Sequence, residues 1–268
     1  MKKRLKIAEQ ISIVLIVALI LPLVIAGAII VNTNQIAVRK ELISSAEIIA
    51  KSVANEISAL KNFEKRNILY SYEALKRISL SSEKDKFLTF MKVNQPDVID
   101  FYIYQLPQRL QIENKYVPSY LKDEKSVIFS LISDDNVQIS KKVNLDYVYE
   151  QIFDDFNSQG RQVYILDEDK ELIFSLDYEQ SRYEDIIANF PVENITDDSA
   201  IVFYKYKNQP NVLIYDAELK WYIVVASPKY LTYYGIIDAR RKIIFAICVA
   251  AAVVFVLFGI HPSFLTFC

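Results

Sequence analysis

Two long apolar segments frame the chain. Residues 11–31 and 243–260 contain no charged side chain, whereas charged and polar positions recur throughout the stretch between them. A helix needs about 20 apolar residues to cross the hydrocarbon core of a bilayer. Each charge at its centre would cost about 2.5–3.5 kcal/mol on insertion scales. We therefore expect two transmembrane helices, at 11–31 and 243–260, with a buried core helix as the competing interpretation of the second.

The start of the chain leaves a second alternative open. Residues 1–6 are strongly basic and residues 26–28 are small, which is typical of a cleavable signal peptide. Apolar residues continue to Val31, beyond a usual signal core, and this favours an uncleaved anchor. The basic start predicts a cytoplasmic segment 1–10, although the basic run 240–242 before the second anchor opposes that orientation. Two crossings then return residues 261–268 to the cytoplasm.

A helical pattern follows the first anchor directly. Residues 32–62 contain neither glycine nor proline, and their apolar positions follow a 3-4 spacing: Ile36, Ile43, Ala46, Ala50, Val53, Ile57 and Leu60. This spacing predicts a long stalk helix over 32–64. Two interpretations of its apolar stripe remain open. The stripe either pairs with a second copy along 36–60 in a homodimer, or packs on the domain that follows.

Beyond the stalk, the apolar period changes from helical to alternating. Helical spacing continues to about residue 93, with Ser82 and Asp85 as a capping pair. Alternation then predicts strands at 98–104, 126–133 and 137–143, with an irregular segment at 105–125. A helix at 145–156, capped by Asn144, leads to five further strands and one short helix. These strands are expected at 161–167, 171–176, 200–207, 211–216 and 220–227, and the helix at 178–190.

Neighbouring antiparallel strands with covering helices indicate an α+β fold. We expect a long N-terminal helix and two sheet units, a membrane-distal one over 65–143 and a membrane-proximal one over 144–235, between the two transmembrane helices. A single elongated unit is the open alternative.

Composition excludes several classes of function for residues 32–242. This stretch holds 27 basic and 32 acidic residues, a net charge of −5, and shows no basic stripe, so we expect no nucleic-acid partner. It contains no cysteine, which excludes a disulfide framework. The only histidine of the chain is His261, so catalytic Ser-His-Asp or Cys-His arrangements and His/Cys zinc sites are excluded there.

The same stretch gives no sign of a catalyst. It has only two glycines, Gly160 and Gly235, and hence no glycine-rich phosphate loop. Its acidic residues fall mostly in turns, although two facing carboxylates in one cleft would revive a hydrolase. We therefore predict no catalytic residue, no metal and no cofactor, and a protein that is not an enzyme.

The order of these elements resembles the extracytoplasmic Cache sensor family, which is PAS-like. The stretches that carry the resemblance are "VNLDYVYEQIF", "VYILDEDKELIFSLD" and "VLIYDAELKWYIVVASPKYL". They place a strand ending in Asp167 before a polar turn. A closing strand with Trp221, Val224, Val225 and then Pro228 precedes the second anchor. The resemblance spans about residues 32–235, and its two sheet units look like a double Cache arrangement.

The resemblance implies a receptor of the bacterial inner membrane, of the kind found in sensor kinases, chemoreceptors and cyclases. Such a receptor senses a small ligand, an amino acid, a carboxylate or an amine, and passes the signal through the second transmembrane helix. The Tyr/Arg/Trp/Asp set of well-known amino-acid binders is not found, so the ligand class stays open.

The membrane-distal unit usually holds the ligand in double forms. Candidate ligand-binding residues are therefore the tyrosines of the distal unit and an arginine whose planar fork suits a carboxylate: Tyr102, Tyr104, Arg109, Tyr116 and Tyr120. The competing interpretation is that they are surface or core-edge tyrosines with a solvated arginine.

The expected cytoplasmic tail, 261–268, contains no lysine or arginine. Family members usually continue into a basic linker and an output domain. The resemblance thus implies either a truncated receptor or one that passes its signal to a separate cytoplasmic transmitter. The alternative function is a structural or adaptor protein of the cell envelope, whose exported domain binds another protein.

Overall fold

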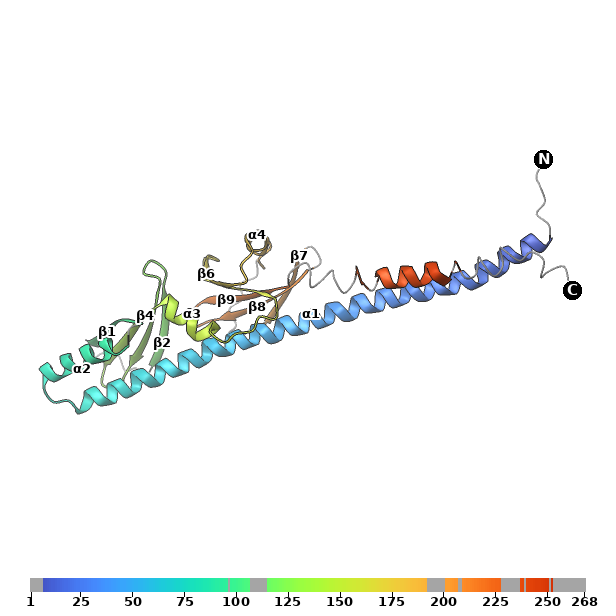
Figure 1. The fold of residues 1–268 in the computed structure, drawn as a ribbon. Helices are drawn as coiled ribbons and strands as arrows, with labels where there is room; N and C mark the ends of the chain where they lie inside the picture. Colours follow the sequence, from blue (N-terminus) through green and yellow to red (C-terminus); the bar gives the residue numbers. More distant parts are fainter. Residues whose placement is uncertain are drawn as a thin grey trace. The chain divides into compact units, whose positions relative to one another are not determined.

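The computed structural model describes residues 7–95, 97–106, 115–191, 201–206, 209–227, 237–238, 240–250 and 252. The chain divides into two compact units. One comprises Ser45–Ser227, and the other comprises Met1–Ser44 together with Pro228–Cys268. Figure 1 shows the order of the elements along the chain. The predicted limits of the stalk and of the two sheet units are not tested by this division and stay predictions.

One helix, α1 (Ile7–Arg77), contains the first apolar segment and the stalk that the sequence predicts to follow it directly. Its only proline, Pro22, lies inside it, and no glycine or proline follows Gly27 before its end. The helix therefore meets no residue that would break it after the first turns. Lys76 and Arg77 lie in its last turn, where positive charge interacts favourably with the helix dipole.

The first sheet has four antiparallel strands in the order β1-β4-β3-β2. Helix α2 precedes it and contacts β1. The predicted Ser82–Asp85 capping pair is wrong, because α2 begins at Ser81 and its N-cap, Leu80, makes no side-chain capping bond. The bounds are α2 (Ser81–Val93), β1 (Val98–Gln105), β2 (Lys115–Leu121), β3 (Ser126–Ile132) and β4 (Val137–Asn144).

Strand β2 lies within the segment that the sequence predicts to be irregular. It pairs only with β3, so it is an edge strand, and Pro118 sits opposite Phe129 in the register. An edge strand tolerates proline because one of its sides has no partner strand that needs an N–H donor. The alternation around Pro118 is too weak to reveal the strand from the sequence.

The second sheet has five antiparallel strands in the order β6-β5-β9-β8-β7. All five are expected from the sequence, as is the turn that joins β5 to β6, where Asp167 Oδ1 accepts from the Glu171 N–H at 2.8 Å. The predicted cap of α3 is confirmed, since the Asn144 side chain accepts from the Tyr147 N–H. The bounds are α3 (Leu145–Phe153), β5 (Gln162–Leu166), β6 (Leu172–Leu176), α4 (Gln180–Ala188), β7 (Ile201–Tyr206), β8 (Gln209–Asp216) and β9 (Trp221–Ala226).

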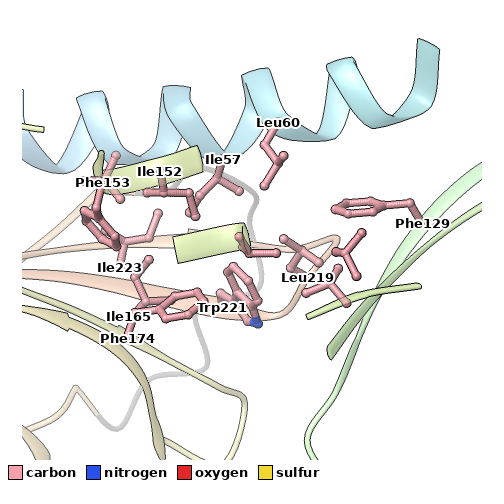
Figure 2. Close-up of a cluster of buried hydrophobic side chains, with 14 of the residues drawn as sticks. Ile57, Leu60, Phe129, Ile152, Phe153, Ile165, Phe174, Leu219, Trp221 and Ile223 are labelled. Carbon is pink, nitrogen blue, oxygen red and sulfur yellow. The ribbon is translucent and has the colours of Figure 1, made fainter. Parts of the chain in front are cut away.

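Both sheets and α1 share one hydrophobic core within Ser45–Ser227 (Figure 2). Ile57 and Leu60 point from α1 toward the sheets. Phe129 comes from the first sheet and Trp221 from the second. Trp221 is fully buried and meets the rings of Tyr120 and Phe174 edge-on, each at 5.8 Å between centroids. Full burial of one such apolar side chain stabilises the fold by about 1.5–3 kcal/mol.

The apolar stripe of the stalk belongs to this core. Ala46, Ala50, Val53 and Ile57 have no exposed surface. For this part of the stripe, packing on the following domain is therefore the interpretation that the structure bears out. Ile36, by contrast, is 62% exposed.

The other unit brings α1 against a helix near the end of the chain. Residues 240–250 are helical, and a Cβ atom added to Gly27 would lie 3.0 Å from Ile247 Cδ1 and 3.1 Å from Ile243 Cγ2. Among the described residues, no helix was found with both the length and the apolar character that a membrane crossing requires.

Candidate functional site

The structure separates the predicted ligand-binding tyrosines into two pairs. Tyr102 and Tyr104 lie on β1, with their rings stacked at 6.0 Å between centroids. Tyr116 and Tyr120 lie on β2. The register aligns Tyr116 with Leu131, Ile139 and Ile103, which places it on the sheet face opposite Tyr102. The four side chains therefore do not form one site, and Arg109 lies outside the described residues.

The pair on β1 faces away from α1. Tyr104 is 52% exposed, and in the register Tyr102 neighbours Ser140, which is hydrogen-bonded to Ser130 at 2.8 Å. Gln138 completes this hydrogen-bonded group by donating to Ser140 Oγ at 3.1 Å. The serine and glutamine groups thus satisfy one another.

Tyr116 is packed into the core side of the sheet. Its ring lies parallel to that of Phe129, at 6.4 Å between centroids, and its hydroxyl is buried without a hydrogen-bond partner. Burial, followed by the negative charge of Glu64, raises the pKa of the Tyr116 hydroxyl. This environment fits the core-edge interpretation of Tyr116 better than a ligand-binding role.

Tyr120 lines a cavity of about 490 Å³ between the two sheets, which we call the seam cavity. Its other walls come from the turn after β2, from α3 and from β6 with the turn before it. The lining residues are Tyr120, Lys122, Lys125, Leu145, Asp146, Tyr149, Glu171, Leu172, Ile173, Phe174 and Ser175. Pockets of this size at the junction of two substructures are the usual place for small ligands.

A lysine bridges the two sheets beside the seam cavity. Lys122 Nζ lies 2.9 Å from Asp169, 3.1 Å from Glu171 and 3.5 Å from Asp167, all in the β5–β6 turn. Hydrogen bonds to Asp169 and Glu171 raise the pKa of Lys122. Because Lys122 is 40% exposed, solvent screens these pairs, and they hold the sheets together only weakly.

A buried ion pair joins α1 to the first sheet. Lys141 Nζ lies 2.7 Å from Glu64 Oε2, and the Tyr147 hydroxyl donates to Glu64 Oε1 at 2.8 Å. Burial, followed by the Glu64 charge, raises the pKa of Tyr147. A cavity of about 300 Å³ adjoins Lys141 and Tyr147. Sequence reasoning missed this group, because nothing in the sequence pairs Glu64 with a lysine 77 positions away.

A third cavity, of about 510 Å³, lies between α1 and α3 and is rich in carboxylates. Glu56, Glu150, Asp154 and Asp155 line it, and all four are exposed. Acid–base catalysis by two carboxylates requires that their environments differ, usually by burial of one of them. The four carboxylates of this groove are all exposed, so the groove does not give any two of them such different environments. Within the described residues, no three His, Cys, Asp or Glu side chains group to hold a metal ion.

The outer face of the second sheet, under α4, holds a polar cluster that sequence reasoning also missed. Arg182 of α4 is buried and donates to the side chain of Asn211 on β8. Burial lowers the pKa of the Arg182 guanidinium. Only the register of the strands, combined with the position of α4, brings these residues together.

No protein-family model and no curated protein sequence matches the chain. Several solved structures match part of this one, at TM-scores below 0.5. The sensory domain of the Campylobacter jejuni chemoreceptor Tlp3, with isoleucine bound, has a TM-score of 0.46 at 8% identity. The match covers 75% of this chain and 98% of that domain.

Two further structures are similar. The ligand-binding domain of the Pseudomonas aeruginosa chemoreceptor PctB, in complex with L-Arg, has a TM-score of 0.41 at 14% identity, covering 73% of this chain and 97% of that domain. The extracellular domain of the putative histidine kinase rpHK1S-Z16 has a TM-score of 0.40 at 10% identity, covering 71% and 94%. All three are described as sensory, ligand-binding or extracellular domains. Likeness at this level assigns no residue roles to this chain.

Proposed function

We propose that the chain is the input part of a two-pass receptor of the bacterial inner membrane. Residues 11–31 and 243–260 anchor it, and the extracytoplasmic Cache-like domain between them binds a small molecule. The absence of charge in both segments supports the anchors. The α+β fold on one long helix supports the sensor.

The observation that carries the proposal is the seam cavity. Its walls come from both sheets, so a ligand held there contacts both at once. The bound ligand favours the packing of the sheets that fits it best, which shifts the population of conformations. Strand β9, which precedes the second anchor in the chain, is the route by which this shift reaches residues 243–260.

The lining of the seam cavity supports an amino acid as the ligand. Lys122 and Lys125 provide positive charge for a carboxylate, and Asp146 and Glu171 provide negative charge for an ammonium group. Apolar surface for a side chain comes from Leu145, Leu172 and Phe174. Small-molecule sites in proteins usually combine a few polar groups with apolar walls in this way.

Calorimetric titration of the full chain in lipid nanodiscs tests this proposal. The probes are the twenty amino acids, with simple amines and dicarboxylates beside them. We expect at least one amino acid to bind saturably, and Lys125→Met and Glu171→Gln to weaken its binding about tenfold or more, the scale of one charged hydrogen bond.

The matched control is Lys86→Met, an exposed lysine on α2, which should leave binding unchanged. Amino-acid binding that survives both cavity substitutions would place the site elsewhere. Failure of every probe, together with capture of an envelope protein by the exported domain, would favour the adaptor function instead.

The receptor proposal includes a homodimer. Residues 46–60 of the stripe pack within one copy, so the contact uses the apolar side chains that α1 leaves exposed. Phe63 and Tyr70 are 46% and 70% exposed and lie seven residues apart on one helix face. Sedimentation analysis should show a dimer that Phe63→Glu weakens and Glu73→Gln does not. A monomeric native chain would contradict this part of the proposal.

A further inference from the structure

The basic run Arg240-Arg241-Lys242 is a feature that the proposed receptor does not yet explain. The proposed anchors place it outside the cytoplasm, although lysine and arginine beside a transmembrane helix are usually cytoplasmic. The structure gives the three side chains different surroundings. Lys242 pairs with Asp238 at 2.7 Å, whereas Arg240 forms no ion pair within the described part of the chain. The charge of Arg240 is therefore available to a partner.

Arg240 borders a groove between α1 and helix 240–250, both of which belong to the same compact unit. The groove has a volume of about 410 Å³, and we call it the anchor groove. It follows α1 from Gly27 to Gln35, a length of about 12 Å at 1.5 Å per residue. Arg241, the next residue along the helix, does not line it.

The lining of the anchor groove changes from apolar to polar along its length. One end is lined by small and aliphatic residues of the two uncharged segments: Gly27, Ala28, Val31, Ile243 and Ile247. Asn32, Gln35 and Arg240 line the other end and lie just beyond those segments. In the proposed receptor, this change falls where the hydrocarbon core of the bilayer meets the headgroups.

The two ends of the groove define the chemistry of its occupant. The arginine fork matches the oxygens of a phosphate, and the amide groups of Asn32 and Gln35 supply further donors. An acyl chain suits the apolar end. Basic residues between transmembrane helices hold anionic lipid headgroups in this way. A choline-type headgroup would place a second cation beside Arg240 and Arg241, where like charges repel, so the occupant has a net negative charge.

We propose that the anchor groove binds one anionic phospholipid of the extracytoplasmic leaflet. Its phosphate lies at Arg240, and one acyl chain lies between α1 and helix 240–250. The site rests on the anchors of the proposed function, but it does not depend on a ligand in the seam cavity. Because the lipid contacts both helices, the lipid composition of this leaflet becomes a second influence on how they pack.

Native mass spectrometry of the full chain released from detergent micelles tests this proposal. The probes are phosphatidylglycerol, phosphatidylcholine and glycerol 3-phosphate, which carries the phosphate without acyl chains. We expect one phosphatidylglycerol to be retained per chain, saturably, at concentrations at which the other two probes are not retained.

Arg240→Gln should weaken retention of phosphatidylglycerol about tenfold or more, the scale of one charged hydrogen bond, and Gln35→Leu about threefold to tenfold. The matched control is Arg241→Gln, which removes the same charge from the adjacent position outside the groove and should retain the lipid as the native chain does. Equal weakening by the two arginine substitutions would overturn the proposal, because the effect would then come from the general charge of the helix.

Three further outcomes would also count against the lipid site. Retention of glycerol 3-phosphate in place of the lipid would assign the groove to a free phosphate compound. Loss of the dimer in Arg240→Gln, with lipid retention unchanged, would assign it to a second copy of the chain. Equal retention of phosphatidylcholine and phosphatidylglycerol would remove the selectivity that the basic run implies.

Alkaline carbonate washing of membranes that contain the chain separates failure of the lipid site from failure of the anchors. A chain that stays in the membrane and shows no preference for phosphatidylglycerol would overturn the lipid site alone. A chain that the wash releases would overturn both the anchors and the lipid site.

Discussion

Glu64 and Lys141 form the most deeply buried ion pair among the described residues. Glu64 has no exposed surface and Lys141 is 3% exposed. Such a pair repays the cost of removing two charges from water only while both partners are present. Its role is therefore best tested by removing one charge at a time.

Glu64→Gln should lower the free energy of unfolding by about 3–5 kcal/mol, because the charge of Lys141 is left buried and uncompensated. Denaturant titration of the full chain in detergent measures this loss. Glu56→Gln, an exposed glutamate on the same helix, is the control and should change little. The double variant with Lys141→Met should recover part of the loss, and native-like unfolding of Glu64→Gln would refute the prediction.

Tyr164 links stability to alkaline pH. It is fully buried, and burial raises the pKa of its hydroxyl to about 12, whereas an unfolded tyrosine ionises near pH 10. A raised folded pKa means that the unfolded state releases its proton first. The stabilising contribution is therefore complete below pH 10 and is lost as pH rises toward 12.

Tyr164→Phe should remove part of this alkaline sensitivity. We expect the unfolding temperature of the native chain to fall more steeply between pH 10 and 12 than that of the variant. Tyr178→Phe, at an exposed position, is the control. Parallel pH profiles for native and Tyr164→Phe chains would rule out this residue as a source of the effect.

Contacts between residues on different strands and helices are the feature that the sequence predicts least well. The tyrosines of β1 and β2 occur in one sequence region and therefore look like one group, but strand register places the two pairs on opposite faces. Register depends on long-range pairing, which one sequence does not display. The pairing of Arg182 with Asn211 cannot be predicted from the sequence for the same reason, because the two residues are 29 positions apart on different elements.

At the scale of elements, the sequence predicts every described strand except β2, with ends close to those observed. The strands of the second sheet have clear alternation and short polar turns, so their positions are predictable. Strand β2 escapes prediction because Pro118 interrupts its pattern. The continuity of α1 is predictable, because the amphipathic pattern follows the apolar one with no residue between them that breaks a helix.

Close packing at Gly27 sets how near α1 lies to helix 240–250. The atoms nearest to a side chain introduced at this position would be the ends of Ile243 and Ile247, which have some freedom to move. Gly27→Ala should therefore be tolerated, whereas Gly27→Ile should force the two helices apart.

Distances between spin labels at Val31 and Ile244 in nanodiscs measure this effect, in a background in which both cysteines, Cys248 and Cys268, are replaced by serine. Both label positions border the groove between the two helices. We expect a longer and broader distance distribution for Gly27→Ile than for Gly27→Ala. Identical distributions would show that glycine is not required at this position.

At the scale of the whole molecule, the two sheets of Ser45–Ser227 depend on one another because they share a core. Phe129 comes from the first sheet and is fully buried in that core. The sequence indicates two sheet units but contains no sign that they are joined in this way.

Phe129→Ala should destabilise the chain by about 3–5 kcal/mol, the usual cost of removing a large buried ring. Because the core is shared, hydrogen exchange should become faster in β9 of the second sheet as well as in β3. Phe90→Ala, at an exposed position on α2, is the control. Unchanged protection of β9 amides would show that the sheets unfold independently.

Two buried ion pairs of α1 have opposite polarity and lie about one helical turn apart. Lys61 pairs with Asp216 at 2.7 Å and Glu64 pairs with Lys141 at 2.7 Å. Burial by itself would lower the pKa of Lys61, but hydrogen bonds to Asp216 and Glu218 raise it overall.

The opposite polarity of these two ion pairs opposes sliding of α1 along the sheets. If α1 moved along the sheets by three residues, about 4.5 Å, one direction would bring Glu64 to Asp216 and the other would bring Lys61 to Lys141. Either step replaces an attraction with a repulsion between like charges in a poorly solvated place. The arrangement thus opposes a piston stroke of α1 past the sheets. Under the proposed function, a ligand would act by rearranging the two sheets against each other instead.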